Sequence, residues 1–162
     1  SSDLNNEMDD FVARPGEPNA YGLVGSEANA VAPGARPLSS MSPTVLIGPD
    51  GTRIAVGASG GPFIITSVLQ AIVAVVDFGA NPSEAVTIPR VHHQWVPEKL
   101  FVDDGIGLDT RNVLAEKGHE VQQMPFFSSV QMVVRDGDGA MYQGASDPRK
   151  GGLPAGAGIR TE

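Results

Sequence analysis

The sequence predicts an α+β fold in one domain, and three features of the chain predict it. Glycine (20 residues) and proline (13 residues) fall where turns would separate short elements. Two pairs of short strand-like runs flank glycine-containing turns, which is typical of β-hairpins. One longer apolar segment has the spacing of a helix. With 162 residues, 41% of them apolar, the chain is long enough for one domain with a hydrophobic core.

The first part of the chain is predicted to be a long loop. Proline and glycine interrupt every possible period between residues 11 and 42. A loop of this length in a compact domain is usually functional. We therefore expect this segment to contribute to function.

A β-hairpin is predicted next. Thr44–Ile47 and residues 52–56 are β-branched runs, and the Gly-Pro-Asp-Gly sequence of residues 48–51 between them has the chemistry of a tight turn. We expect both strands to be buried.

Two helices are predicted after this hairpin. Residues 63–78 have apolar side chains at helical spacing, and Pro62 suits the first turn because its missing N–H costs nothing there. A shorter helix then begins with Asn81 as its cap, Pro82 in the first helical position and Glu84 in the third. We expect the first of the two to be the longest and most apolar helix of the chain.

The rest of the chain is predicted to hold a third helix followed by strands. The helix covers residues 109–117 and ends at Gly118, which suits a left-handed conformation. The strands, of which the last two form a second hairpin, cover Val121–Met124, 130–135 and 140–143. We assign residues 1–149 to one domain and expect the glycine-rich tail, residues 150–162, to be poorly ordered.

The composition excludes several classes of function. Nineteen acidic residues against 11 basic ones give a formal charge of −8, which disfavours binding to nucleic acid and to acidic lipid headgroups. The absence of cysteine excludes disulfides, thiolate metal sites and cysteine nucleophiles. The chain has no apolar run long enough to predict a membrane span.

Gly60 and Gly61 are the first candidates for chemistry. A strand that runs into two glycines and then a helix exposes backbone N–H groups at the positive end of the helix dipole. The same geometry can stabilise the oxyanion of a tetrahedral intermediate in acyl transfer. The alternative is a tight strand-to-helix turn without a ligand.

Two polar segments could bind the charged groups of a small molecule. The adjacent hydroxyls of Ser39 and Ser40 could donate hydrogen bonds to a carboxylate. Within the acidic residues 5–11, one carboxylate could pair with an ammonium group and Glu7 could accept hydrogen bonds from it. The alternatives are a polar turn and a solvated acidic segment. A metal site at this acidic segment lacks a third ligand at a suitable spacing.

The histidine pair and the second acidic turn are better explained by structure than by catalysis. His92 and His93 are neighbours on an extended segment, so their imidazoles point to opposite faces and do not easily bind one ion. We expect one of them to be hydrogen-bonded in the interior near Trp95. Residues 136–139 (Asp-Gly-Asp-Gly) lack the downstream glutamate of a calcium loop, and we interpret them as a hairpin turn.

Taken together and in order, several motifs resemble the C-terminal part of the small, catalytic subunit of γ-glutamyltransferases (γ-glutamyltranspeptidases, or glutathione hydrolases). The resemblance covers almost the whole chain. Its motifs are Asn-Asn-Glu-Met-Asp-Asp-Phe at residues 5–11, Pro-Asn-Ala-Tyr-Gly-Leu-Val-Gly at 18–25, Arg-Pro-Leu-Ser-Ser-Met-Ser-Pro-Thr at 36–44, Gly-Gly at 60–61, Pro-Arg at 89–90, His-His-Gln-Trp at 92–95 and Gly-Ala-Ser-Asp-Pro-Arg at 144–149.

The resemblance implies an N-terminal nucleophile hydrolase with a layered αββα sandwich, incomplete here because the first strands lie upstream. Such an enzyme is made as a precursor that cleaves itself into a large and a small subunit. A catalytic threonine attacks the γ-carbonyl of glutathione or another γ-glutamyl compound. Water or the amine of an amino acid or dipeptide then takes the γ-glutamyl group. The resemblance also implies a periplasmic or extracellular location and no metal or organic cofactor.

The resemblance assigns roles to residues already singled out. Asp10 would hold the α-ammonium of the γ-glutamyl group, with Glu7 beside it. Ser39 and Ser40 would bind the α-carboxylate together with an arginine of the large subunit. The backbone N–H groups of Gly60–Gly61 would form the oxyanion hole.

Two departures from the family pattern affect these expectations. The family usually has Ser-Pro before the glycine pair, whereas Ala58 and Ser59 stand here. The family's threonine lies upstream of the Asn-Asn-Glu motif, so we expect no nucleophile in this chain and no activity of the chain by itself. Ser1, with its α-amine as base, is an alternative nucleophile. Sheet edges left without neighbours should promote self-association.

Two alternative functions remain at this point. One is a relative with the same fold that acts on a different acyl group, such as a cephalosporin acylase, although the serine pair and Asp10 argue against it. The other is a non-catalytic domain that binds γ-glutamyl compounds or acts only in assembly.

Overall fold

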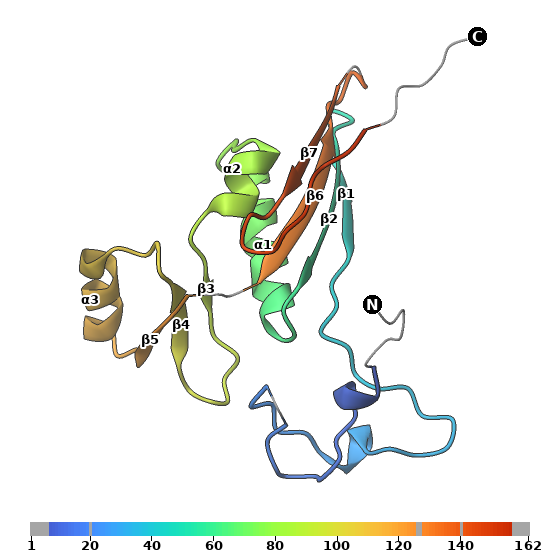
Figure 1. The fold of residues 1–162 in the computed structure, drawn as a ribbon, viewed down its shortest axis with the longest axis vertical. Coiled ribbons are helices and arrows are strands. Elements are labelled where there is room, and N and C mark those ends of the chain that lie inside the picture. Colours follow the sequence, from blue (N-terminus) through green and yellow to red (C-terminus); the bar gives the residue numbers. More distant parts are fainter. Residues whose placement is uncertain (1–6, 20, 126–127, 140, 157–162) are drawn as a thin grey trace.

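A four-stranded antiparallel sheet forms the centre of the fold (Figure 1). The structure is a computed structural model that describes residues 7–19, 21–125, 128–139 and 141–156. The strand order is β1-β2-β6-β7, with strands β1 (Thr44–Ile47), β2 (Arg53–Ser59), β6 (Ser129–Arg135) and β7 (Tyr142–Ser146). The two predicted hairpins are confirmed, because β1 pairs with β2 and β6 pairs with β7, both antiparallel.

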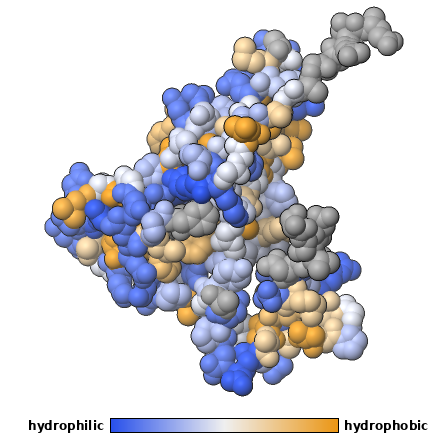
Figure 2. Space-filling view, in the orientation of Figure 1, coloured by the Kyte–Doolittle hydropathy of each residue, from blue (hydrophilic) through white to orange (hydrophobic). Residues whose placement is uncertain are grey.

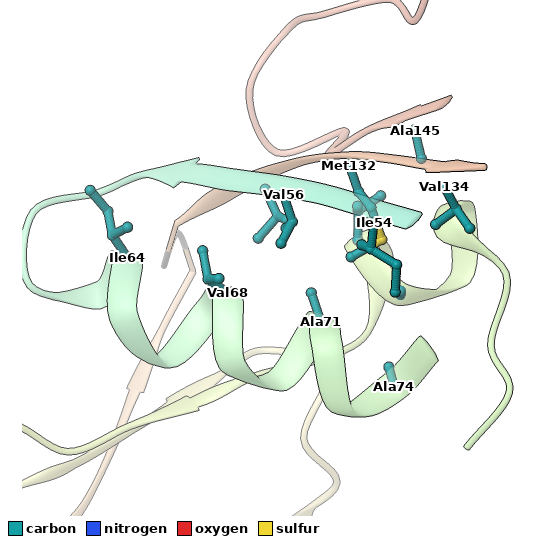
Figure 3. Packing of buried hydrophobic residues seen from close by; sticks show 12 residues of the cluster. Ile54, Val56, Ile64, Val68, Ala71, Ala74, Met132, Val134 and Ala145 are labelled. Atoms are coloured by element: carbon teal, nitrogen blue, oxygen red, sulfur yellow. The ribbon is translucent and has the colours of Figure 1, made fainter. Parts of the chain in front are cut away.

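The helices α1 (Phe63–Val76) and α2 (Pro82–Thr87) cover one face of this sheet (Figure 1). Alternate residues of each strand point toward α1, as the period of two requires. The resulting core is shown in Figure 3 and includes Ile54, Val56, Met132 and Val134 from the sheet and Ile64, Val68, Ala71 and Ala74 from the helix. Small alanines on α1 allow the helix to approach the sheet closely.

The opposite face of the sheet is largely uncovered, so the expectation that both strands of the first hairpin are buried is wrong for β1. Val45 and Ile47 are 74% and 72% exposed, and Val133 on β6 is 46% exposed. These side chains point away from α1 because of the strand alternation. Pro154 of the tail lies against Gly144 on this face, where a shallow cavity of about 500 Å³ lies between the tail and the strands.

A second, three-stranded sheet lies beside the first (Figure 1). Its strands β3 (Val91–His92) and β4 (Leu100–Asp103) are antiparallel, and β4 is parallel to β5 (Val121–Met124). The helix α3 (Leu108–Glu116) makes the crossover that a parallel pair needs. The sequence predicted β5 and α3 but missed β3 and β4 as strands.

The predicted helix boundaries agree with the structure to within two residues. The side chain of Asn81 accepts from the backbone N–H of Glu84, and the Glu84 carboxylate accepts from the N–H of Asn81, which is the expected capping box. Gly118 follows α3 with φ = +93°. Strand β7 begins two residues later than predicted because the turn after β6 extends to Met141, whose carbonyl accepts from the N–H of Asp136.

Residues 7–19 and 21–42 form an irregular segment below the sheet, near the start of α1 (Figure 1). It contains two short 3-10 helices, η1 (Glu7–Asp10) and η2 (Glu27–Asn29), and the predicted loop is otherwise confirmed. Apolar surface is visible at the bottom of Figure 2. The exposed apolar residues of this segment include Met8, Val31 and Leu38. Across the part of the chain that is described, no helix has the length and hydropathy needed to cross a bilayer.

Candidate functional site

Asp10, Ser39 and Ser40 line one cavity in the N-terminal segment. The cavity has a volume of about 620 Å³ and is lined by residues of η1, of the loop around Tyr21 and of the chain that leads to β1. Asp10 and the two serines are far apart in the sequence but line the same cavity. The predicted binding groups are therefore brought together.

Asn29 holds the two sides of this cavity at a fixed separation. Its side chain is buried; Nδ2 donates to the backbone oxygen of Asp10 at 2.8 Å, and Oδ1 accepts from the N–H of Leu38 at 3.0 Å. The N–H of Val12 also donates to the Asn29 carbonyl at 2.9 Å. One amide thus connects the Asp10 segment to the serine pair. Asn29 was not predicted from the sequence, because an asparagine in a loop has no pattern that marks it as buried.

Glu7 lies in the same 3-10 helix as Asp10. It begins η1, is exposed, and is not among the residues that line the cavity. The neighbouring residues Asn5 and Asn6, and the alternative nucleophile Ser1, lie outside the described residues.

Gly60 and Gly61 form the turn between β2 and α1, as predicted. Their φ angles of +141° and +59° lie in the region that favours glycine. A Cβ atom on Gly60 would approach Ser128 to 3.0 Å, and one on Gly61 would approach the ring of Tyr21 to 3.0 Å. Backbone conformation and close packing therefore both require glycine here.

Tyr21 connects this turn to the cavity. Its ring packs on Gly61, and the same residue lines the cavity that contains Asp10 and the serines. The two groups of predicted site residues are consequently neighbours in space. Tyr21 was part of a recognised motif, but no role was predicted for it.

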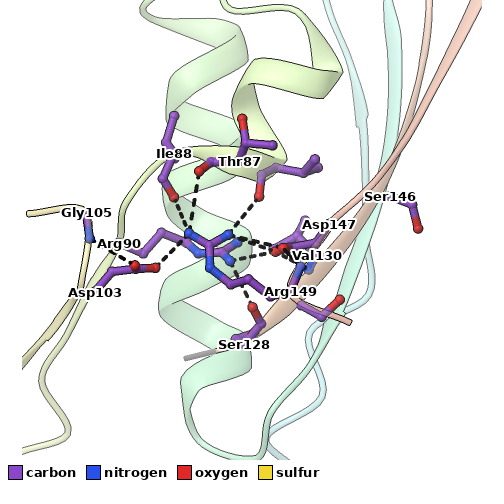
Figure 4. A network of polar contacts seen from close by, with 12 residues as sticks. Thr87, Ile88, Arg90, Asp103, Gly105, Ser128, Val130, Ser146, Asp147 and Arg149 are labelled. Atoms are coloured by element: carbon purple, nitrogen blue, oxygen red, sulfur yellow. Dashed lines mark hydrogen bonds and ion pairs between the residues drawn. The ribbon is translucent and has the colours of Figure 1, made fainter. Parts of the chain in front are cut away.

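A buried ionic network, shown in Figure 4, is hydrogen-bonded through Ser128 to the end of the strand that leads into the glycine turn. Arg90 Nη2 donates to Asp147 Oδ2 at 2.6 Å and to the carbonyl of Ser128 at 2.8 Å, and the hydroxyl of Ser128 donates to the carbonyl of Ser59 at 2.9 Å. Burial by itself raises the pKa of Asp147. Hydrogen bonds from Arg90 and from backbone N–H groups outweigh burial and hold this pKa below its ordinary value.

Arg149 extends the same network to α2 and to the second sheet. Its guanidinium donates to the Ile88 carbonyl at 3.1 Å and to Asp103 Oδ2 at 2.7 Å, and also contacts Asp147 (Figure 4). Positive charge is favourable at the carbonyl end of a helix. The network was missed at the sequence level, although Arg90, Asp147 and Arg149 belong to the recognised motifs.

Ser59, which stands where the family usually has proline, makes a bond that proline cannot make. The Lys150 ammonium donates to Ser59 Oγ at 2.9 Å. This contact and the Ser128 hydroxyl bond restrain the residue before Gly60. The turn is therefore held by side-chain contacts in place of a proline ring.

His92 is buried and His93 is exposed, which confirms the predicted structural role of one histidine. The His92 ring packs on Phe63 at a centroid distance of 4.2 Å and is bonded to Thr66 and Gln94. Burial lowers the pKa of His92, while the bond with Gln94 acts in the opposite direction. Trp95 is exposed and does not line this interior site.

In the described ranges of the chain, no group of three or more histidine, cysteine, aspartate or glutamate side chains is arranged to hold a metal ion. Residues 136–139 form part of a hairpin turn, as predicted.

Comparison with known proteins identifies the family to which the chain is similar. Residues 3–157 match the family model described as gamma-glutamyltranspeptidase. The chain is 51% identical over 146 residues to the glutathione hydrolase proenzyme of Escherichia coli K12, which covers 90% of this chain and 25% of that protein. The chain thus spans about a quarter of the length of this curated relative.

Two solved structures are similar over nearly the whole chain. One is the T380A mutant of Helicobacter pylori γ-glutamyltranspeptidase, with a TM-score of 0.83, 45% identity, and coverage of 91% of this chain and 81% of that one. The other is γ-glutamyltranspeptidase from Pseudomonas nitroreducens in complex with L-DON, with a TM-score of 0.85, 35% identity, and coverage of 96% and 81%. The chain therefore belongs to the γ-glutamyltranspeptidase family and carries part of an N-terminal nucleophile hydrolase fold.

Proposed function

We propose that this chain is the part of a γ-glutamyl-cleaving enzyme that binds the γ-glutamyl group and stabilises the oxyanion. The observation that carries the proposal is the single cavity lined by Asp10, Ser39 and Ser40, with Tyr21 reaching from it to Gly61. The large subunit of the same precursor is the partner that this function requires.

The cavity has the groups that a zwitterionic head needs. A carboxylate such as Asp10 pairs with an ammonium, and hydroxyls donate to a carboxylate. Ser39 Oγ accepts from the N–H of Met41 at 3.2 Å, which leaves its hydroxyl hydrogen available to a ligand. Asp10 and the serine pair can therefore select for a free α-amino and α-carboxyl group on one substrate.

The glycine turn supplies the second part of the proposed role. A nucleophile from elsewhere in the complete protein attacks the γ-carbonyl carbon, and the oxygen becomes an oxyanion that the N–H groups of Gly60 and Gly61 stabilise. If the nucleophile is a hydroxyl, the proton that it loses on attack goes to the leaving amine as the C–N bond breaks, and the γ-glutamyl group stays on its oxygen as an ester. Water, or the amine of an amino acid or dipeptide, takes the group in a second step.

Two anilides that differ in one charged group test this proposal on the complete protein that carries this sequence. γ-Glutamyl-p-nitroanilide has both an α-ammonium and an α-carboxylate, whereas glutaryl-p-nitroanilide lacks the ammonium. Asp10→Asn is expected to raise the KM for the first by about 10- to 100-fold, because a charged hydrogen bond is lost. The same change should alter the KM for the second by less than about threefold.

Asp9→Asn is the matched control, because Asp9 lies in the same 3-10 helix, lines the same cavity and loses the same charge. It should leave the KM for the γ-glutamyl anilide within about threefold of the unsubstituted value. Equal kcat/KM for the two anilides would favour an acylase with a different acyl group. Binding of γ-glutamyl compounds without any anilide hydrolysis would favour the non-catalytic alternative.

A further inference from the structure

The side chain of Gln94 joins the second sheet to the loop that carries Tyr21. Gln94 Nε2 donates to the Tyr21 carbonyl at 3.1 Å and to the Val96 carbonyl at 3.0 Å, and its Oε1 lies 2.9 Å from His92 Nε2. All the hydrogen-bonding groups of this amide are thus engaged in one bridge between distant parts of the chain.

The partners of Gln94 determine how the amide and the imidazole are oriented. Two carbonyls can only accept, so the amide nitrogen must face them and Oε1 must face His92. His92 Nε2 must therefore carry a hydrogen and donate to Oε1. In the neutral ring Nδ1 then accepts, and it lies 2.8 Å from the Thr66 hydroxyl, whose one hydrogen can go to Nδ1 or to the Phe63 carbonyl at 3.2 Å.

The hydrogen-bonded bridge begins on α1, the helix that follows the Gly60–Gly61 turn. Thr66 is on the first turn of α1, and one turn later Gln70 clamps β3: its Oε1 accepts from the N–H of Val91 at 3.0 Å and its Nε2 donates to the Val91 carbonyl at 2.8 Å. His92 and Gln94 are therefore held at a fixed height along α1. The helix that holds them, α1, is the one that follows directly after Gly60 and Gly61.

We propose that Gln94, oriented by His92, is a positioning residue that fixes the Tyr21 loop over the Gly60–Gly61 turn. The Tyr21 loop forms part of the wall of the cavity that Asp10 and the serines also line, and the Gly60–Gly61 turn leads directly into α1. The bridge from α1 through Gln94 therefore sets the distance between the loop and the turn. The contact of Pro97 with Gly22 adds to it, since a Cβ on Gly22 would lie 3.3 Å from the proline ring. The structural part of this proposal is independent of the proposed function, and only its kinetic part rests on it.

Hydrogen exchange in the complete protein tests the structural part. Gln94→Glu keeps the shape and the acceptor toward His92 but removes both donors to the carbonyls. The N–H groups of Gly16, Asn19 and Gly22 donate to backbone carbonyls within the loop and report its opening. We expect their exchange to become about tenfold faster or more, and exchange in β2 and β6 to stay unchanged.

Two further variants control for the new negative charge of Gln94→Glu. Gln94→Met is uncharged and of similar size, and should give the same local effect if the new charge prevents folding. Gln122→Glu makes the same charge change on the exposed face of β5, away from the loop, and should change nothing. Unchanged exchange in the loop of Gln94→Glu and Gln94→Met overturns the proposal. Faster exchange that includes β2 and β6 also overturns it, because the role would then be one of general stability.

The kinetic part of the proposal is tested by a separate measurement of kcat/KM. With γ-glutamyl-p-nitroanilide, kcat/KM of folded Gln94→Met should fall by about tenfold, since small misplacements of binding groups are costly to reaction. Loop opening with unchanged kcat/KM would overturn the positioning role. A complete protein that does not cleave the anilide at all would contradict the proposed function, while the exchange result would still decide whether Gln94 holds the loop.

Discussion

The Arg90 guanidinium and the Asp147 carboxylate meet at 2.6 Å with both side chains fully buried. Nε and Nη1 of Arg90 find no hydrogen-bond partner among the described residues. The charge of Arg90 is therefore compensated mainly through one nitrogen and one carboxylate. Such a pair adds little net stability compared with an apolar pair, but breaking it leaves a buried charge without a counter-ion.

Asp147→Asn is expected to lower the free energy of unfolding by about 3–5 kcal/mol, because Arg90 keeps its charge and loses its counter-ion. Chemical denaturation of the complete protein measures this. Glu120→Gln is the control: its ion pair with Lys99 spans 3.2 Å with side chains 37% and 67% exposed, and its loss should cost less than about 1 kcal/mol. Similar losses in the two variants would contradict the importance of burial.

His92 makes stability depend on pH in a predictable direction. Its pKa is lowered in the folded protein by burial, so between this value and the unfolded value of about 6.5 the unfolded chain binds more protons. The stabilising contribution is therefore complete above about pH 6.5 and falls as the pH drops through this window. The stability of the unsubstituted protein minus that of His92→Gln should decrease from pH 7 to pH 5. A difference that is constant or that increases toward low pH would contradict this.

Local signals in the sequence predicted much of the fold. The capping box at Asn81 and Glu84 and the glycine after α3 depend on residues within four positions, so they can be recognised without tertiary structure. Strand β4 was missed because all four of its residues are buried and show no alternation. Its acidic residue Asp103 is buried only because Arg149, from a distant segment, pairs with it. The exposure of β1 was mispredicted because alternation does not tell which face is covered.

The site was predictable where a motif identifies a residue and not where a tertiary contact does. Asp10, Ser39 and Ser40 were found through the order of motifs, and the chemistry of a carboxylate and two hydroxyls agreed with it. Asn29 contacts a backbone oxygen 19 residues away, and Gln94 contacts one 73 residues away. No spacing rule relates such positions.

Gly61→Ala separates close packing from backbone strain when it is compared with Gly79→Ala. Both glycines have a left-handed conformation, with φ of +59° and +68°, but a Cβ on Gly79 meets nothing within 4 Å, whereas one on Gly61 approaches the Tyr21 ring to 3.0 Å. Gly79→Ala should cost about 1 kcal/mol of stability and leave kcat/KM for the γ-glutamyl anilide unchanged. Gly61→Ala should lower kcat/KM by about tenfold or more, because Tyr21 and the turn are displaced. Equal kcat/KM in the two variants would show that the Tyr21 contact does not matter for reaction.

Asn29→Ala should weaken substrate binding without touching the substrate. The variant loses the bonds that connect Asp10 to the chain before the serine pair, so the two binding groups are no longer held at a fixed separation. We expect the KM for γ-glutamyl-p-nitroanilide to rise by about tenfold and stability to fall by about 1–3 kcal/mol. Asn81→Ala is the control, because the Asn81 side chain also accepts a backbone hydrogen bond, at the start of α2, and Asn81 does not line the cavity. A KM that rises equally in both variants would argue for a general loss of stability.

The uncovered face of the main sheet predicts that the 162-residue chain expressed by itself associates with other copies. Val45, Ile47 and Val133 present apolar surface on this face, and β1 and β7 end the sheet with backbone groups that can pair with another chain. Light scattering should show a mass that increases with concentration.

Val45→Lys combined with Val133→Lys should reduce the increase, because lysine on exposed strands opposes pairing. Leu108→Lys, which changes an exposed residue of α3 away from this face, should not reduce it. A monomer over a wide concentration range would mean that this face is tolerated in water, and that the rest of the protein is not needed to cover it.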